Sequence, residues 1–203
     1  MIFLDTPGPS MVIAFIILLA LSAFFSASET ALASVNKIRL KTRAEDGDKR
    51  AARVLRLSED FDRTLSAILI GNNVVNIASA SISTVFFTAV FGAQGAAVST
   101  AVTTVFVLIF GEILPKSLAK DNAEAVSVMT SGPLEAIKTV LSPLVWFFIQ
   151  IKRLFTGRRS NELNIQPSVT EEELKTIIDT VEEEGVLDRQ ETDIIQSAID
   201  FNN

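Results

Sequence analysis

Three apolar stretches, each long enough to cross the hydrocarbon core of a bilayer, limit what this chain can fold into. They cover about residues 11–35, 64–91 and 98–119, and a helix needs roughly 20 apolar residues to span about 30 Å of hydrocarbon. The composition agrees, because 48% hydrophobic residues and a mean hydropathy of +0.38 exceed the values of an ordinary soluble domain. We therefore expect an all-α integral membrane protein with three transmembrane helices.

Basic residues set the expected orientation of these helices. The loop at 37–56, KIRLKTRAEDGDKRAARVLR, carries eight basic and three acidic side chains, so the positive-inside rule places it in the cytoplasm. Lys116 and Lys120 return the third helix to the same side, whereas the connection at 92–97 is short and uncharged. We expect a multi-pass protein of the cell (inner) membrane, with its N-terminus outside and its C-terminus in the cytoplasm.

A fourth apolar run is expected to lie along the membrane surface. Charged residues and Pro143 interrupt this run, from 136 to 155. If it crossed the membrane, the basic pairs at 152–153 and 158–159 would lie outside, against the charge rule. We predict a proline-broken juxtamembrane belt of interfacial helices over about 123–155.

A change in net charge divides the chain into two modules. Residues 168–203 carry eleven acidic and two basic side chains, a net charge of −9, whereas the remainder carries +3. We expect a transmembrane domain over 1–157, a polar linker over 158–167 and then a cytoplasmic acidic helical bundle. Capping patterns predict two helices in the tail, one starting at Thr170 and one at Asp188. In the helix that starts at Asp188, no residue typical of a helix end follows the apolar stripe before the last residue, so we expect a further domain to follow.

The absence of cysteine, histidine and tyrosine removes several kinds of site. Disulfides, thiolate chemistry, zinc or iron sites with Cys or His ligands, and His-based catalytic triads are excluded. No serine has a lysine at the same membrane depth, which disfavours a Ser–Lys hydrolase, and we expect no enzyme. A metal site would have to be all oxygen, and oxygen suits hard cations such as magnesium or calcium.

Each predicted span contains polar residues that are costly in a bilayer. They are Ser22, Ser26 and Glu29 in the first span, Asn72, Asn73 and Asn76 in the second, and Glu112 in the third. Counted from the flanking charges at about 1.5 Å per residue, all three groups lie in the cytoplasmic half of the membrane. Such residues normally face a protein interior, a partner or a water-filled cavity. Glu29, at the end of its span, is expected to reach the interface or to pair with Lys37 or Arg39 rather than bind an ion directly.

A proline gives the third group, FGEILPK at 110–116, a more specific meaning. Pro115 has no amide hydrogen, so the carbonyl of Gly111, four residues earlier, loses its helical partner. A cation could satisfy this carbonyl beside the Glu112 carboxylate. The alternatives are structural: a plain proline kink, asparagines that hold helices together, and serines bonded to their own backbone.

The three motifs, in this order, resemble the membrane domain of the CorC/cyclin-M (CNNM) family of magnesium transporters. The resemblance rests on FFSASETAL, LIGNNVVN and FGEILPK, and it covers roughly residues 8–155. It implies a homodimer with three membrane helices per protomer, a juxtamembrane belt and an inward-facing cavity that holds Mg²⁺. The ion ligands that it implies are Ser22, Ser26, Asn73, the Gly111 carbonyl and Glu112, with Glu29 and Asn76 as second-rank candidates.

The resemblance also implies a function, the export of Mg²⁺ by alternating access with coupling to Na⁺. Proteins of this family continue into an acidic bundle and a CBS-pair module, so ATP is expected only through a module that lies beyond this sequence. The expected partners are a second copy, the lipid bilayer, Mg²⁺ and Na⁺, with no nucleic acid. The residues leave open calcium in place of magnesium, and direct or water-mediated binding by Glu112. The alternative function is a membrane anchor or sensor that positions a regulatory cytoplasmic module.

Overall fold

All elements that the structure describes are helices. The computed structural model describes residues 8–156, 178, 182 and 188–200. Contacts divide the chain into one unit of residues 1–149 and another of residues 150–203. The predicted linker at 158–167 and the predicted helix start at Thr170 lie outside the described residues. Over the residues that are described, the prediction of an all-helical chain is confirmed.

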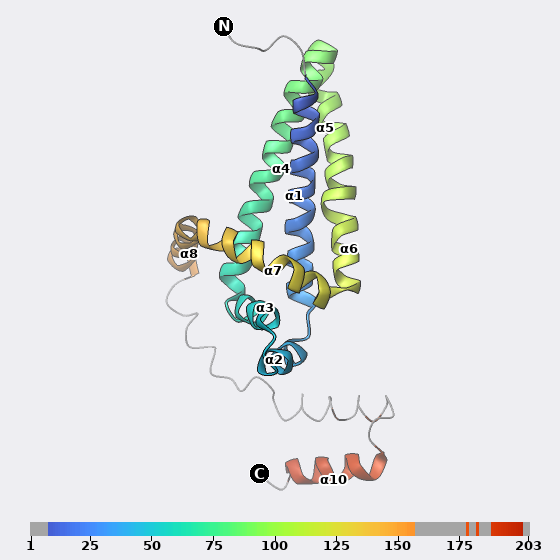
Figure 1. Cartoon of the computed structure of the whole chain (residues 1–203), viewed down its shortest axis with the longest axis vertical. Coiled ribbons are helices and arrows are strands. Elements are labelled where there is room, and N and C mark those ends of the chain that lie inside the picture. Colours follow the sequence, from blue (N-terminus) through green and yellow to red (C-terminus); the bar gives the residue numbers. More distant parts are fainter. Residues whose placement is uncertain (1–7, 157–177, 179–181, 183–187, 201–203) are drawn as a thin grey trace. The chain divides into compact units, whose positions relative to one another are not determined.

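Three long helical rods lie side by side in the first unit (Figure 1). The rods are α1 (Pro9–Ser34), α4 (Phe61–Phe91), and a third made of α5 (Gly95–Phe106), η2 (Val107–Ile113) and α6 (Leu114–Asp121). The chain reverses between the second and third rods in the short turn η1 (Gly92–Gln94), where Gly92 has φ 58°. This left-handed conformation favours glycine, because it has no Cβ.

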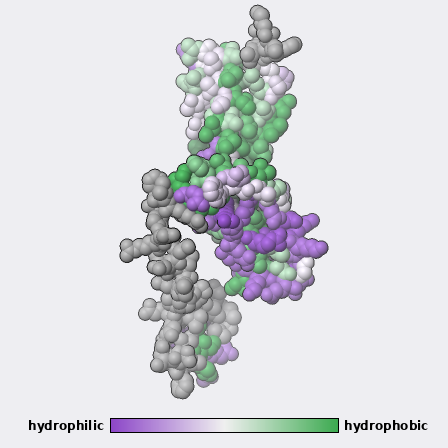
Figure 2. Space-filling view, turned by 90° about the vertical axis from the view of Figure 1, so that its left-hand side faces the viewer, coloured by the Kyte–Doolittle hydropathy of each residue, from purple (hydrophilic) through white to green (hydrophobic). Residues whose placement is uncertain are grey.

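Two helical stretches are long and apolar enough to cross a membrane. They are Pro9–Ser34 and Phe61–Asp121, and the second contains 61 residues because α4 and the third rod are counted together. Figure 1 shows that this second stretch is folded into a hairpin. In Figure 2, green apolar surface gathers along the rods, whereas purple polar surface gathers at the end of the unit where α2 and α3 lie.

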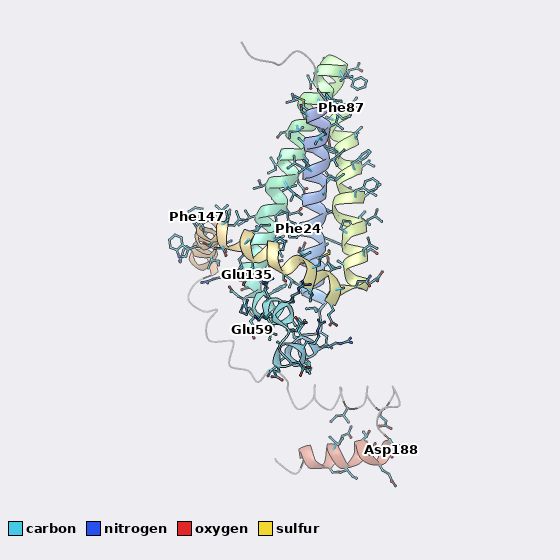
Figure 3. The ribbon with its side chains drawn as sticks, in the orientation of Figure 1. Phe24, Glu59, Phe87, Glu135, Phe147 and Asp188 are labelled. Atoms are coloured by element: carbon cyan, nitrogen blue, oxygen red, sulfur yellow. The ribbon has the colours of Figure 1, made fainter. Side chains whose placement is uncertain are left out.

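The predicted break in the juxtamembrane belt is present. Helix α7 (Ala123–Val140) and helix α8 (Ser142–Thr156) meet at an angle of 68°, directly before Pro143. Trp146 and Phe147 on α8 are 61% and 52% exposed, and Figure 3 shows the Phe147 ring pointing away from the bundle. Exposed aromatic rings are typical of helices at a membrane interface.

The basic loop forms two helices, α2 (Lys37–Glu45) and α3 (Lys49–Glu59), which are tied to the belt by ion pairs. The pairs that join them or the start of α4 to α7 are Arg39–Glu124 at 3.5 Å, Arg43–Glu124, Arg53–Glu135 at 3.0 Å, Arg56–Glu135 at 3.3 Å and Asp60–Lys138 at 2.8 Å. Each of these partly exposed pairs is weak by itself, because water and salt screen it. Beneath them, buried Leu40, Val54 and Leu134 pack into one core.

In the second unit, α10 (Arg189–Asp200) begins at the predicted capping position. The backbone N–H of Glu191 donates to Asp188 Oδ1 at 2.8 Å, and the backbone N–H of Asp188 donates to Glu191 Oε2 at 3.0 Å. This reciprocal pair is a capping box, so the sequence-based start of this helix is confirmed. Ile194 remains 68% exposed among the described residues.

Asp48 holds the start of α3 in place. Its carboxylate accepts hydrogen bonds from the backbone N–H of Ala51 at 3.2 Å and of Arg50 at 2.9 Å, and from Arg43 Nη2 at 2.6 Å. The bond from Ala51, then those from Arg43 and Arg50, lower the pKa of Asp48 below its ordinary value of 3.8. The ionised Asp48 therefore stabilises the fold at any pH above its pKa in the unfolded chain. This stabilisation is lost as the pH falls through the lower pKa that Asp48 has in the folded chain.

We predict that Asp48→Ala frays the start of α3 at neutral pH. Amide exchange at Arg50 and Ala51 should become severalfold faster, because both N–H groups lose their acceptor. Hydrogen exchange read by mass spectrometry checks this, with Asp46→Ala as the control, since the exposed Asp46 side chain makes no hydrogen bond with a described residue. At low pH, where Asp48 is protonated, the exchange rates at Arg50 and Ala51 in the wild type should approach those of Asp48→Ala, after correction for the intrinsic rates. Equal exchange at neutral pH in the wild type and Asp48→Ala would contradict the account.

Candidate cation site

Ser22 joins α1 to α4 at the centre of the candidate site. Its side chain is fully buried, and its hydroxyl oxygen lies 2.8 Å from Oδ1 of Asn76 and 3.1 Å from Oδ1 of Asn72. A hydroxyl carries one hydrogen, so Ser22 donates to one of these two oxygens at a time. The other amide oxygen therefore keeps a lone pair that a further ligand can use.

Gly111 brings the third rod against the same serine. A Cβ at Gly111 would lie 2.9 Å from Oγ and 3.3 Å from Cβ of Ser22, and Gly111 is itself buried. Glycine is needed for this approach because any side chain would push α1 and η2 apart. These contacts show that Ser22, the two asparagines of α4 and Gly111 lie at one level along the three rods.

The backbone around Gly111 is a π-helix rather than an α-helix. This segment, η2, covers Val107–Ile113, and at its end the N–H of Leu114 donates to the carbonyl of Ile109, five residues earlier. Isolated π segments are rare and occur mostly at functional sites. This register was not predicted from the sequence, because a π segment has no distinct signature in apolar periodicity.

Pro115 removes a donor directly after the π segment. In a five-residue register the missing N–H would have paired with the carbonyl of Phe110, and in a four-residue register with the carbonyl of Gly111. The missing N–H therefore leaves one of these two consecutive carbonyls without its helical partner, and the register decides which one. Both precede Glu112, so backbone and carboxylate oxygens are concentrated on one short stretch.

Two polar side chains of the candidate site have no partner among the described residues. Ser26, one helical turn after Ser22, is 1% exposed, and its hydroxyl makes no hydrogen bond there. Glu112 is half-buried and forms neither a hydrogen bond nor an ion pair with a described residue. Because buried polar groups are ordinarily satisfied, an orphan hydroxyl and a lone carboxylate are features of a site that takes a ligand.

Two sequence-predicted residues lie elsewhere than expected. Asn73 is exposed on α4 and makes no hydrogen bond with a described residue, so Asn72 and Asn76, not Asn73, contact Ser22. The predicted pairing of Glu29 with Lys37 or Arg39 is wrong. Glu29 Oε2 instead lies 3.4 Å from Lys116 Nζ, because α6 returns beside the end of α1.

A groove whose lining includes five serine and threonine residues begins next to Asn76. It has a volume of about 270 Å³ and runs between α4 and α5, where Thr84, Ser99 and Thr103 contribute to its walls. Two of the lining residues bond to Ser83 of α4, whose Oγ accepts hydrogen bonds from Ser99 Oγ at 2.9 Å and from Thr103 Oγ1 at 2.6 Å. A second groove of about 300 Å³ on the α1 side of the hairpin is lined by apolar side chains such as Phe15 and Phe106.

The charge of the candidate site is low. In the part of the chain that the structure describes, no three acidic side chains gather into a metal-binding group. A cation beside η2 would therefore meet one carboxylate, Glu112, together with neutral hydroxyl, amide and carbonyl oxygens. Such a set suits a hard cation such as Mg²⁺ or Ca²⁺.

The rods and the polar cluster between them define an integral membrane protein with an oxygen-rich site among its apolar helices. The comparison with known proteins then gives the family. The chain belongs to the cyclin M (CNNM) family, because the model of the cyclin M transmembrane N-terminal domain matches residues 13–191.

Curated relatives agree with this assignment. The chain is 34% identical to the UPF0053 inner membrane protein YfjD of Escherichia coli over 89% of its own length and 42% of that protein. It is 39% identical to a UPF0053 protein of Haemophilus influenzae over 85% of its length and 41% of that protein. A polyamine export protein of Escherichia coli is 27% identical over 92% of the chain and 44% of that protein. The chain thus spans about two fifths of the length of these relatives.

We predict that Gly111→Ala destabilises the bundle by about 1–3 kcal/mol, the usual cost of overpacking. The new methyl group would meet Ser22 Oγ at 2.9 Å, so α1 and η2 would have to separate. Thermal unfolding in detergent measures the effect. Gly132→Ala is the matched control, because its Cβ would meet only the flexible end of Arg53 at 3.2 Å.

The Ser22→Ala change in the Gly111→Ala background should recover part of the loss, since it removes the nearest atom. If the two glycine variants unfold at the same temperature, the close approach at Gly111 is not a constraint on the fold.

Proposed function

We propose that this chain is the membrane part of a divalent-cation transporter whose substrate is Mg²⁺. In this proposal the three rods cross the bilayer three times, with the N-terminus outside and the C-terminus in the cytoplasm. The site among α1, α4 and η2 binds the ion from the cytoplasm, and alternating access releases it on the other side. Charge supports the orientation, because the basic α2–α3 loop lies at one end of the rods.

The observation that carries the proposal is the convergence at Ser22. Helices α1 and α4 and the π segment η2 meet there: Ser22 contacts the amide oxygens of Asn72 and Asn76, and Gly111 lies against Ser22. Ser26 and Glu112 add a hydroxyl and a carboxylate that lack partners among the described residues. Mg²⁺ prefers six oxygens and commonly retains water. One carboxylate with neutral ligands would hold it loosely enough for release.

The groove with serine and threonine in its lining supports a route from the site toward the opposite end of the rods. It starts at Asn76 and continues along α4 and α5 past Thr100 and Thr104, both exposed on this single chain. Polar side chains that face lipid are costly, so this face is better suited to water or to a second protomer. This agrees with the homodimer that the family resemblance implies.

The proposal has two further parts, one second candidate cargo and one alternative to transport. Coupling to Na⁺ and regulation by ATP through a CBS-pair module are expectations for the longer protein. A polyamine is the second candidate cargo, because one relative is named a polyamine export protein. A membrane anchor or sensor is the alternative to transport.

We predict that Glu112→Gln lowers Mg²⁺ flux in proteoliposomes at least about tenfold, because the site loses its charged ligand. The matched control is Asp121→Asn, which removes an exposed acid at the end of the same rod. Opposed Na⁺ gradients test the coupling, and added spermidine tests the second cargo. Equal Mg²⁺ flux in Glu112→Gln and wild type would reject the site. If flux persisted in all variants and only changes in the tail altered function, the anchor or sensor would be favoured.

A pair of asparagine variants distinguishes the ligands from α4. We predict that Asn76→Ala weakens Mg²⁺ binding more than Asn73→Ala does, since Asn76 contacts Ser22 whereas Asn73 is exposed. Isothermal titration measures both affinities. A larger loss in Asn73→Ala would support the ligand set that the family resemblance implies.

A further inference from the structure

Lys116 follows Glu112 by four residues but pairs with a different carboxylate. Its Nζ atom lies 3.4 Å from Oε2 of Glu29, which joins α6 to the last turns of α1. The side chains of Lys116 and Glu29 are 43% and 27% exposed. Glu112, in contrast, is half-buried and has no ion pair with a described residue. Lys116 therefore pairs with Glu29, which lies near the end of α1, and leaves Glu112 without an ion pair to a described residue.

The sequence spacing also allows Lys116 to pair with Glu112. Glutamate four residues before lysine is the favourable order for an ion pair on one helix. The lysine side chain has a flexible four-carbon stem, so its ammonium group can move between two carboxylates without a change in the backbone. Glu29 and Glu112 are thus alternative partners for one cationic side chain.

We propose that Lys116 is a built-in counter-cation that competes with the transported divalent cation for Glu112. In the arrangement of this structure, Lys116 is held by Glu29 and Glu112 is open to the cation. When the cation leaves, Lys116 moves to Glu112. This inference rests on the proposed function of the site and adds a residue that sets its affinity and turnover.

The cost of an isolated charge explains why such a residue is useful. A carboxylate without a partner among apolar helices is unfavourable, and a transporter must also pass through states in which its site is empty. An ion pair with Lys116 would neutralise Glu112 in those states. Glu29 can be released more cheaply, because it lies near the end of α1, where water is accessible. Competition of this kind also lowers the apparent cation affinity, which aids release.

A double-mutant cycle on the full 203-residue chain tests the proposal, with Mg²⁺ affinity measured by isothermal titration. Lys116→Gln should tighten binding about two- to fivefold, the range expected for a partly exposed ion pair. Glu29→Gln should weaken it by a similar factor, because Lys116 loses its alternative partner. The double variant should bind as tightly as Lys116→Gln, since Glu29 acts only through the lysine. Lys116→Arg should retain the wild-type affinity.

A long-range electrostatic field would give the same signs in the single variants, but its effects would add. The double variant would then return to the wild-type affinity. Lys120→Gln, which removes an exposed charge one turn further along α6, would tighten binding almost as much as Lys116→Gln. Either result overturns the competition. If the wild type binds Mg²⁺ and the effects add, only this inference fails; if neither the wild type nor Lys116→Gln binds Mg²⁺, the proposed function fails with it.

Discussion

The close approach of Gly111 to Ser22 is the contact on which the arrangement of the candidate site depends. It places the π segment of the third rod directly on α1, at the level where Ser22 also reaches the asparagines of α4. A residue with a side chain at 111 would separate the two helices and spread these oxygens apart. The absence of a side chain at position 111 therefore lets η2 lie directly on α1, at the level where Ser22 contacts α4. This close packing brings the polar groups of the three helices together.

The remaining charges of the first unit are used differently. Four of the eight basic residues of α2 and α3 pair with Glu124 or Glu135 of α7, so that loop is attached to the belt by ion pairs over a small apolar core. Glu112 has no such partner in the described residues. Glu124 and Glu135, which hold helices together, thus lie apart from Glu112, the acid without such a partner. The Glu29–Lys116 pair joins α6 to α1. Glu112 precedes the same lysine by four residues, a spacing that favours an ion pair on a helix.

Much of this architecture could be predicted from the sequence because apolar run length and charge are strong signals in membrane proteins. The runs near 11–35 and 64–91 correspond to α1 and α4, and Pro143 marks the break between α7 and α8. Residue counting from the flanking charges also predicted that Ser22, the asparagines and Gly111 would meet. It could not decide which asparagine turns toward Ser22, because Asn72 and Asn73 differ by about 100° around the helix. The π register and the Glu29–Lys116 pair were missed for a related reason, since both depend on how helices rotate and pack.

The central claim is that oxygens from α1, α4 and η2 bind one divalent cation. Mn²⁺ has a similar preference for oxygen ligands, and its anomalous X-ray scattering can locate it in crystals of the protein. The account predicts an anomalous peak between the three helices, in contact with the Glu112 carboxylate or one water away from it, and with Ser22 or Ser26 nearby. Anomalous peaks found only on the acidic tail, with none beside Glu112, would contradict it.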